Sequence, residues 1–283
     1  SRLTHPTVDA LMGGGYVPND MDLSHGGQVA MVITGPNMGG KSSFMRANAL
    51  LVIMAQVGSF VPADEMHMGV FDNVFTRMGA EDFIAQGRST FMVELQEAAD
   101  ILVRATSRSL IIMDELGRGT STHDGTAIAY ATLRTLVQDI RAFTLFVTHY
   151  QLICQLQTEM PSQVGNYHMG YMEESENRII FLYKLVTGSA KRSFGLNVAL
   201  LAKLPEDIVQ RAASMSQRLE AHVQEKLGEC LAVLAAKVMH QVGTATESAG
   251  TDTAADEAAN GLAGRLMAFA KEARQLLSAR TLI

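Results

Sequence analysis

Eight consecutive residues near the start of the chain have the pattern of a phosphate-binding loop. Two glycines, Gly35 and Gly40, have four residues between them and are followed by Lys41 and Ser42. Such a loop turns its backbone N–H groups toward an anion, while the lysine ammonium contacts the terminal phosphates and the hydroxyl can ligate Mg²⁺. A glycine-rich turn at a helix start is the alternative interpretation. The predicted nucleotide contacts are Gly35, Pro36, Asn37, Met38, Gly39, Gly40, Lys41, Ser42 and Ser43.

The segments on either side of this loop provide the setting that the chemistry requires. Residues 29–33 are an apolar run typical of a buried strand, and residues 40–57 are good helix formers. Because a phosphate-binding loop joins a strand to a helix, this context favours a nucleotide site over a plain turn.

Polar side chains also follow two further strand-like runs. Asp114 and Glu115 come directly after residues 109–113, and His149 lies just beyond residues 143–147. Ligands of open α/β sheets bind at the carboxyl ends of strands, so Asp114 could hold Mg²⁺ through its water shell and Glu115 could polarise an attacking water. His149 could hydrogen-bond the γ-phosphate or that water. A solvated acidic pair and a polar surface histidine are the alternatives.

A third polar segment, residues 87–92, lies between the phosphate loop and the acidic pair. Ser89 or Thr90 could cap the helix that follows. The same helix start could instead offer a second anion site, suited to the nucleotide of a neighbouring subunit. The residues of this segment leave both interpretations open.

The elements that must position these side chains alternate between strand-like and helical segments. Two strand candidates late in the chain, residues 164–172 and 178–186, flank a charged stretch and resemble a hairpin at a sheet edge. Repeated strand and helix units predict an α/β fold around a mostly parallel sheet with flanking helices. The other predicted strands are 29–33, 70–77, 109–113 and 143–147, and the predicted helices are 40–57, 90–105, 124–138 and 151–157.

Composition divides the chain into five parts. Residues 1–28 show no sustained period and are predicted to be an irregular lead-in to a core of residues 29–204. Over residues 205–240 apolar side chains recur at helical spacing, which predicts a long amphipathic helix. Residues 241–260 have the composition of a flexible linker, and residues 261–283 predict a terminal amphipathic helix.

Length and charge exclude several classes of protein. The 283 residues include 23 Lys and Arg against 29 Asp and Glu, a formal net charge of −6, which argues against the chain itself wrapping nucleic acid. No apolar run is long enough to span a bilayer, so no membrane is expected among its partners. The two cysteines lack metal or disulfide spacing, which indicates a reducing compartment.

The chain contains four motifs in this order: Thr34 to Ser42, Gly87 to Met92, Asp114 to Thr122 and Thr148 to Tyr150. Together they resemble the ATPase domain of the MutS family, the DNA mismatch-recognition ATPases. The resemblance covers residues 1–215, and the runs 123–125 and 164–170 are most similar to the eukaryotic MutS homologue 3 subfamily.

The resemblance implies an ABC-type P-loop fold, ATP and Mg²⁺ as ligands, and composite dimer sites that join the phosphate loop of one subunit to residues 87–92 of the other. It places Asn37 close to the phosphates. Tyr16 and Tyr183 match the rings that flank the adenine in the family, although edge packing would explain both. The implied roles are phosphate contact for Lys41, Mg²⁺ binding for Ser42 and Asp114, general base for Glu115, γ-phosphate sensor for His149, and contact with the partner's nucleotide for Ser89.

The resemblance also implies partners. Family members carry DNA-reading domains before the ATPase domain, and none has a counterpart here, so we expect a carboxyl-terminal portion that reaches mismatched or looped DNA through other domains. The subfamily implies a heterodimer with a MutS homologue 2-like subunit, dimerisation through residues 205–240, repair of insertion and deletion loops, MutL-type partners and residence in the nucleus.

Three other functions remain open at this point. The chain could belong to a MutS subfamily that forms homodimers, or could bind ATP without hydrolysing it. It could also be the nucleotide-binding subunit of an ABC transporter, although residues 87–92 lack the LSGGQ-like signature expected there.

Overall fold

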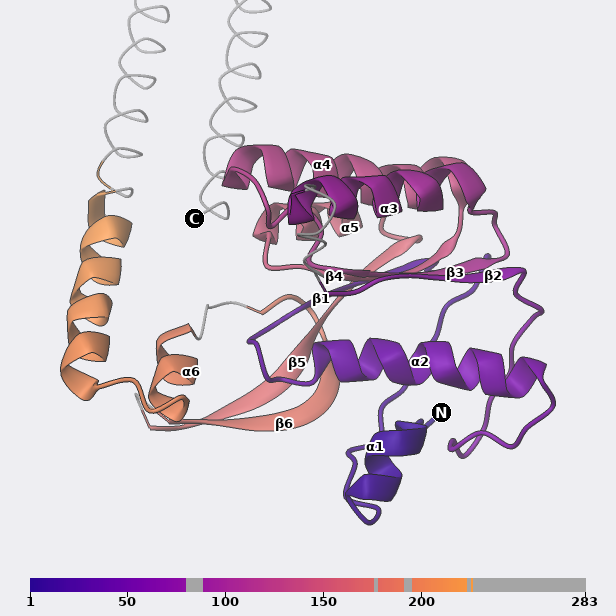
Figure 1. Ribbon diagram of the computed structural model, residues 1–283, viewed down its shortest axis with the longest axis horizontal. Coiled ribbons are helices and arrows are strands. Elements are labelled where there is room, and N and C mark those ends of the chain that lie inside the picture. The colour runs from indigo at the N-terminus through magenta and orange to yellow at the C-terminus, as the bar shows by residue number, and fades with distance from the viewer. Residues whose placement is uncertain (80–88, 176–177, 191–194, 223–224, 226–283) are drawn as a thin grey trace, which may run out of the picture. The chain divides into compact units, whose positions relative to one another are not determined.

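The computed structural model describes residues 1–79, 89–175, 178–190, 195–222 and 225 (Figure 1). The chain divides into two units, Ser1–Lys203 and Leu204–Ile283. The predicted linker over residues 241–260 and the predicted terminal helix over residues 261–283 lie outside the described residues.

A six-stranded sheet forms the centre of the first unit, with its strands in the order β2-β3-β4-β1-β5-β6. β1 pairs in parallel with β4 and β5, β3 pairs in parallel with β2 and β4, and β6 runs antiparallel to β5. The mostly parallel sheet and the hairpin at its edge confirm the prediction. The strands are β1 (Ala30–Thr34), β2 (Asn73–Arg77), β3 (Ser109–Asp114), β4 (Phe143–Val147), β5 (Val164–Ser175) and β6 (Arg178–Thr187).

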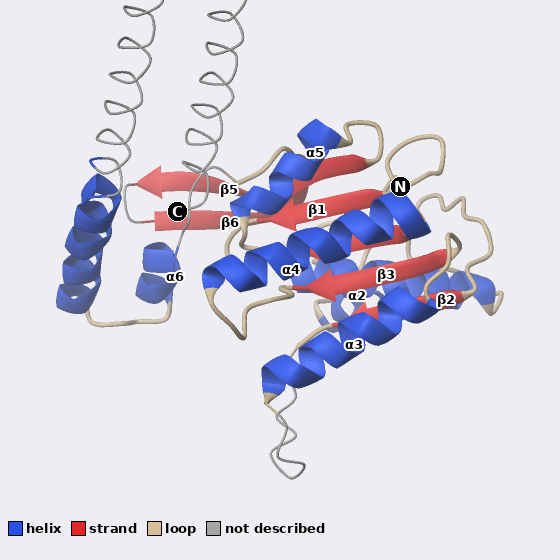
Figure 2. Cartoon of the chain, turned by 90° about the horizontal axis from the view of Figure 1, so that it is seen from above, coloured by secondary structure: helices blue, strands red, loops and turns tan. Residues whose placement is uncertain are grey.

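Helices cover both faces of this sheet. α3, α4 and α5 lie on one face, and α1 and α2 lie on the other (Figures 1 and 2). The helices are α1 (Pro6–Leu11), α2 (Lys41–Gln56), α3 (Thr90–Arg104), α4 (Thr122–Thr135), α5 (Leu156–Glu159) and α6 (Gly195–Leu201). A π-helical turn, η2 (Leu136–Ile140), continues α4, and a 3₁₀ turn, η3 (Gln151–Gln155), leads into α5.

Alternate residues of the central strand β1 belong to two different hydrophobic clusters, one on each face of the sheet. In β1, Val32 packs in the cluster that includes Leu133 of α4, whereas Met31 and Ile33 pack in the cluster that includes Phe44 of α2. Because both faces of a parallel sheet are covered, its strands read as continuous apolar runs instead of alternating ones. This double burial holds the carboxyl ends of the strands in a fixed arrangement.

The structure differs from the prediction in the lead-in, which is not wholly irregular. Residues 6–11 form α1, where Pro6 occupies the first turn and the His5 ring accepts a hydrogen bond from the Val8 N–H at 3.3 Å. Six residues are too few to show a helical period, which is why pattern analysis missed this helix. Leu3 pairs with Asn19 in an isolated antiparallel bridge.

Some element boundaries also differ. β2 begins at Asn73, three residues later than predicted, because its partner β3 begins at Ser109 and offers no strand to pair with residues 70–72. The predicted helix over residues 151–157 is divided between η3 and α5.

In the second unit, residues 206–222 are helical, which agrees with the first part of the predicted amphipathic helix. Ile208, Met215 and Leu219 are exposed apolar side chains of this helix. Within the described part of the chain, the helices are too short or too polar to cross a membrane.

Candidate functional site

The order of the sheet brings the predicted site residues to one edge. Ile33 of β1 is paired with Val147 of β4, and Val147 is paired with Asp114 of β3, so these three residues form one row across the sheet. Ligands of open α/β sheets bind at this carboxyl edge. The phosphate loop, the residue after Asp114 and the segment after β4 therefore leave the sheet side by side.

The phosphate loop curls around the side chain of Lys41, the first residue of α2. The Lys41 ammonium donates hydrogen bonds to the Gly35 carbonyl at 2.7 Å and the Pro36 carbonyl at 2.9 Å, and lies 3.5 Å from the side-chain oxygen of Asn37. Burial lowers the pKa of Lys41, although nearby carboxylates oppose that shift. The loop thus holds a cation within its own curve, where an entering anion would meet it.

The backbone at the end of the loop requires glycine. Gly40 has a φ of 95°, in the left-handed region, and a Cβ added there would lie 3.3 Å from the Tyr183 ring. Gly40 supplies no side-chain cap to α2, so the first N–H groups of that helix have no side-chain partner from the capping position. Met38 also has a positive φ, of 70°, and is exposed together with Asn37, whereas Gly39 is buried.

Ser42 and Asp114, the predicted metal ligands, lie together. The Ser42 hydroxyl donates a hydrogen bond to Oδ2 of Asp114 at 2.8 Å. Burial raises the pKa of Asp114, while the bond from Ser42 acts in the opposite direction. A hydroxyl and a carboxylate are the oxygen ligands that suit Mg²⁺. The donor set of this pair therefore fits the ion that the sequence predicts.

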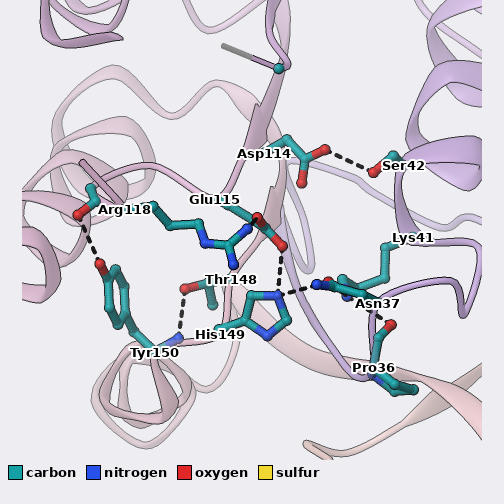
Figure 3. A network of polar contacts seen from close by, with 12 residues as sticks. Pro36, Asn37, Lys41, Ser42, Asp114, Glu115, Arg118, Thr148, His149 and Tyr150 are labelled. Atoms are coloured by element: carbon teal, nitrogen blue, oxygen red, sulfur yellow. Dashed lines mark hydrogen bonds and ion pairs between the residues drawn. The ribbon is translucent and has the colours of Figure 1, made fainter. Parts of the chain in front are cut away.

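A chain of polar contacts runs from Glu115 through His149 to Asn37, whose side chain also lies near the Lys41 ammonium (Figure 3). Nε2 of His149 lies 2.6 Å from Oε1 of Glu115 and 3.0 Å from Oδ1 of Asn37, and Arg118 pairs with the other carboxylate oxygen of Glu115. Burial alone would raise the pKa of Glu115. The hydrogen bond and electrostatic interaction with His149, together with the positive charges of Arg118 and Lys41, outweigh burial and hold this pKa below its ordinary value. The carboxylate is consequently ionised, as a proton acceptor must be.

The two predicted ring residues both lie at the start of α2. The Tyr16 hydroxyl is 3.3 Å from the Ser43 hydroxyl, and the Tyr183 ring adjoins Gly40. Asn19, which pattern analysis did not single out, connects their segments, since its side chain donates to the Tyr183 carbonyl at 2.9 Å and accepts from the Leu185 N–H at 2.6 Å. Tyr183 is 47 % exposed, which leaves part of its ring free for contact.

Ser89 caps α3, as the first of its two interpretations predicts. Its hydroxyl accepts a hydrogen bond from the Met92 N–H at 3.2 Å, and the residue is exposed. Capping and contact with a partner's nucleotide are compatible, because a hydroxyl has further hydrogen-bonding capacity. Gly87 and Arg88, which precede Ser89 in the motif, lie outside the described residues.

Pattern analysis also missed two residues that contact the loop after β3. The carboxylate of Glu94, on α3, accepts a hydrogen bond from the Gly117 N–H at 2.6 Å, and the Tyr150 hydroxyl donates to the Gly117 carbonyl at 2.8 Å. In the sequence, Glu94 could have been noticed only as a charged residue among the apolar positions of the predicted helix over residues 90–105. Tyr150 stands out only as a neighbour of His149.

A comparison with protein families finds one family whose sequence profile matches most of the chain. Residues 31–220 match the sequence profile of MutS domain V. The matched range contains the phosphate loop, the Asp114 and Glu115 pair, Ser89 and His149.

Individual proteins are also similar to the chain. "DNA mismatch repair protein Msh3" of Homo sapiens is 52% identical over 237 residues, covering 78% of the chain and 21% of that protein. The proteins of the same name from Dictyostelium discoideum and Arabidopsis thaliana are each 50% identical, over 234 and 229 residues, and again cover 78% of the chain. The chain spans 16% and 21% of their respective lengths, so it corresponds to a minor part of each relative.

Proposed function

The chain belongs to the MutS family, and we propose that it is the ATP-hydrolysing part of a DNA mismatch repair protein similar to Msh3. One observation carries the proposal: Lys41, the pair of Ser42 and Asp114, and the pair of Glu115 and His149 gather at a single edge of the sheet. All of them lie within the range that matches MutS domain V.

Binding of ATP rests on the phosphate loop and its flanking rings. Lys41 exchanges its loop carbonyl partners for phosphate oxygens, and the uncapped start of α2 adds N–H donors. Tyr16 and Tyr183 flank the base. Ser42 and Asp114 would hold Mg²⁺, which when bound neutralises charge on the phosphate oxygens.

Hydrolysis rests on Glu115 and His149. Glu115 accepts a proton from the attacking water, and its lowered pKa keeps it ionised for that purpose. His149 fixes the orientation of this carboxylate through the 2.6 Å contact, and its ring lies between Glu115 and Asn37 of the phosphate loop. A histidine placed in this way responds to the presence of a phosphate beside Asn37.

The output of hydrolysis is a conformational change in a dimer. Ser89, exposed at the start of α3, contacts the nucleotide of the partner subunit, so ATP favours the closed dimer by its extra contacts there. We infer that the partner is a MutS homologue 2-like subunit and that the helix over residues 206–222 contributes to the dimer. By the same similarity, the whole protein acts in the nucleus on insertion and deletion loops, with DNA bound by other domains and with MutL-type partners.

A test of this proposal is steady-state ATP hydrolysis by the purified chain over a range of its own concentration, alone and titrated with the ATPase domain of a MutS homologue 2-like protein. Activity that stays low until the second protein arrives, and saturates near equal stoichiometry, supports the heterodimer. Specific activity that rises with the concentration of the chain alone would indicate a homodimer instead. Retained Mg-ATP binding without hydrolysis in any mixture would overturn the assignment as a hydrolase.

A further inference from the structure

The backbone of Gly117 is held from both sides, by the buried Glu94 side chain and the partly buried Tyr150 side chain. Its N–H donates to the Glu94 carboxylate at 2.6 Å, and its carbonyl accepts from the Tyr150 hydroxyl at 2.8 Å. Glu94 belongs to α3, whereas Tyr150 follows the strand β4. One glycine residue of the loop after β3 therefore connects two elements that are distant in the sequence.

This connection lies next to a strained residue. Glu115 has a φ of 55°, in the left-handed region, which is unfavourable for a side chain that carries a Cβ. Such a conformation persists when the surroundings over-determine it. The Glu115 N–H donates to the Val147 carbonyl at 2.9 Å, and the Leu116 side chain is fully buried, so the Gly117 contacts add a third restraint two residues further on.

The two hydrogen bonds that join Gly117 to Glu94 and to Tyr150 are called the clamp below. On its Glu94 side, the carboxylate is held by buried partners. The Glu94 side chain is 6% exposed, and its second carboxylate oxygen lies 3.3 Å from the Arg77 guanidinium, which is itself 5% exposed. Arg77 ends β2 and also pairs with Glu97 at 3.2 Å. A buried ion pair of this kind is costly to break, so Glu94 has little freedom to leave Gly117.

On the Tyr150 side of the clamp, the hydroxyl and the Gly117 carbonyl pack closely against Gly125 of α4. A Cβ added to Gly125 of α4 would lie 2.6 Å from the Tyr150 hydroxyl and 2.1 Å from the Gly117 carbonyl. Thr148 accepts a hydrogen bond from the Tyr150 N–H at 3.0 Å, which fixes the backbone on either side of His149 (Figure 3). The position of Tyr150 is thereby linked to that of His149.

We propose that Glu94 and Tyr150 are positioning residues for ATP hydrolysis: by clamping Gly117, they hold Glu115 opposite His149 and join both to α3, the helix that Ser89 caps. The polar contacts of these two side chains are with Gly117 and Arg77 and not with the phosphate loop. The inference rests on the proposed function of Glu115 and His149, but it concerns residues to which that function assigns no role.

The first test compares Tyr150→Phe with Tyr130→Phe in the chain mixed with its partner subunit. Tyr130 is the control, because its hydroxyl also donates to an acceptor, the carboxylate of Glu159 at the end of α5. Loss of one hydrogen bond worth about 1 kcal/mol predicts a fall in kcat of about five-fold for Tyr150→Phe. The KM for ATP and the melting temperature should match those of Tyr130→Phe. A kcat equal to that of Tyr130→Phe would overturn the positioning role.

The second test does not depend on turnover. Hydrogen exchange of the Gly117 amide, followed in nucleotide-free chain, should become at least five-fold faster in Glu94→Gln and in Tyr150→Phe but not in Tyr130→Phe. If Glu94→Gln fails to fold, Tyr150→Phe alone decides. Unchanged exchange overturns the clamp whatever the hydrolysis rate. Faster exchange in the variants, together with no ATP hydrolysis by the unsubstituted chain in any mixture, would support the clamp and overturn the proposed function instead.

Discussion

The imidazole Nε2 of His149 lies 2.6 Å from the Oε1 atom of Glu115, although the two residues follow different strands. β3 and β4 are neighbours in the sheet, and their register sets Asp114 opposite Val147, so the residues that follow are brought into contact. A carboxylate held by an imidazole at the edge of a phosphate loop is suited to accept a proton from water. The predictions below begin with this pair.

Glu115→Gln should abolish hydrolysis while ATP binding persists. The amide keeps the size of the side chain but cannot accept the proton of the attacking water, so we expect kcat to fall by about 10²- to 10⁴-fold. ATP affinity should stay the same or increase, because a negative charge near the phosphates is removed. Steady-state hydrolysis and equilibrium binding of ATP measure the two effects separately.

A suitable control for this variant is Glu159→Gln. Glu159 is an exposed carboxylate at the end of α5 that bonds Tyr130, so its loss should leave hydrolysis unchanged. Hydrolysis by Glu115→Gln at the rate of this control would remove Glu115 from the role of base.

Two substitutions of Ser89 should separate its contact with a partner from its capping of α3. Ser89→Ala should lower stability by about 1 kcal/mol, because the Met92 N–H loses its acceptor, and should weaken ATP binding at the partner's phosphate loop. Ser89→Asp restores the cap but places a negative charge toward the partner's phosphates. We therefore expect it to recover the melting temperature and not the activity of the mixed dimer. Recovery of both would show that Ser89 only caps the helix.

Tyr16→Ala and Tyr183→Ala should each weaken ATP binding about ten-fold, because stacking of a base on an aromatic ring contributes roughly 1–3 kcal/mol. Affinity for tripolyphosphate, which has no base, should not change. Tyr16→Phe keeps the ring and loses only a 3.3 Å contact with Ser43, so it should bind ATP almost normally. Calorimetric titration with both ligands checks this expectation, and an equal loss for ATP and tripolyphosphate would contradict base stacking.

Cys154 should be unreactive in the folded chain. Burial raises the pKa of its thiol from 9.0 to about 11, so the thiolate fraction at pH 8 should be about 100-fold lower than in the unfolded chain. Alkylation followed by peptide mass spectrometry, with and without urea, measures the difference. Rapid alkylation in the absence of urea would show that the thiol is accessible.

The same shift predicts a pH dependence of stability. Because the pKa is higher in the folded state, the stabilisation from the protonated thiol is fully present below pH 9 and is lost as the pH rises through about 11. Relative to Cys154→Ala, the wild-type chain should therefore lose stability over this range. Urea unfolding midpoints of the two chains at pH 8 and pH 10.5 provide the comparison.

The alternation of strands and helices could be predicted from the sequence because both faces of the sheet are covered. Runs such as residues 109–113 and 143–147 are continuously apolar for that reason, and their boundaries agree with β3 and β4 to within one residue. The hairpin of β5 and β6 could be predicted because a charged stretch separates two apolar segments. The order of the strands could not, since the placement of β1 between β4 and β5 depends on packing between segments far apart in the chain.

The candidate site could be predicted from the sequence where particular residue types stand at the fixed spacing of a motif. Lys41, Ser42, Asp114 and Glu115 belong to such patterns. Glu94 is different, because its contact with Gly117 spans 23 positions and arises only when α3 packs beside the loop after β3. Asn19 is the same kind of residue, with partners on β6 more than 160 positions away. Local spacing contains no signal for contacts of this range.

The two hydrogen bonds from Asn19 to β6 determine where the chain can be shortened. A fragment trimmed to Val29 would retain every strand of the sheet and the whole phosphate loop. It would lose Tyr16 outright, and Tyr183 would lose the link that joins its backbone to the lead-in. The bridge between Leu3 and Asn19 extends this dependence further back. We therefore expect the shortest stable fragment to include Leu3, because a boundary drawn at the first strand would divide the compact unit of residues 1–203.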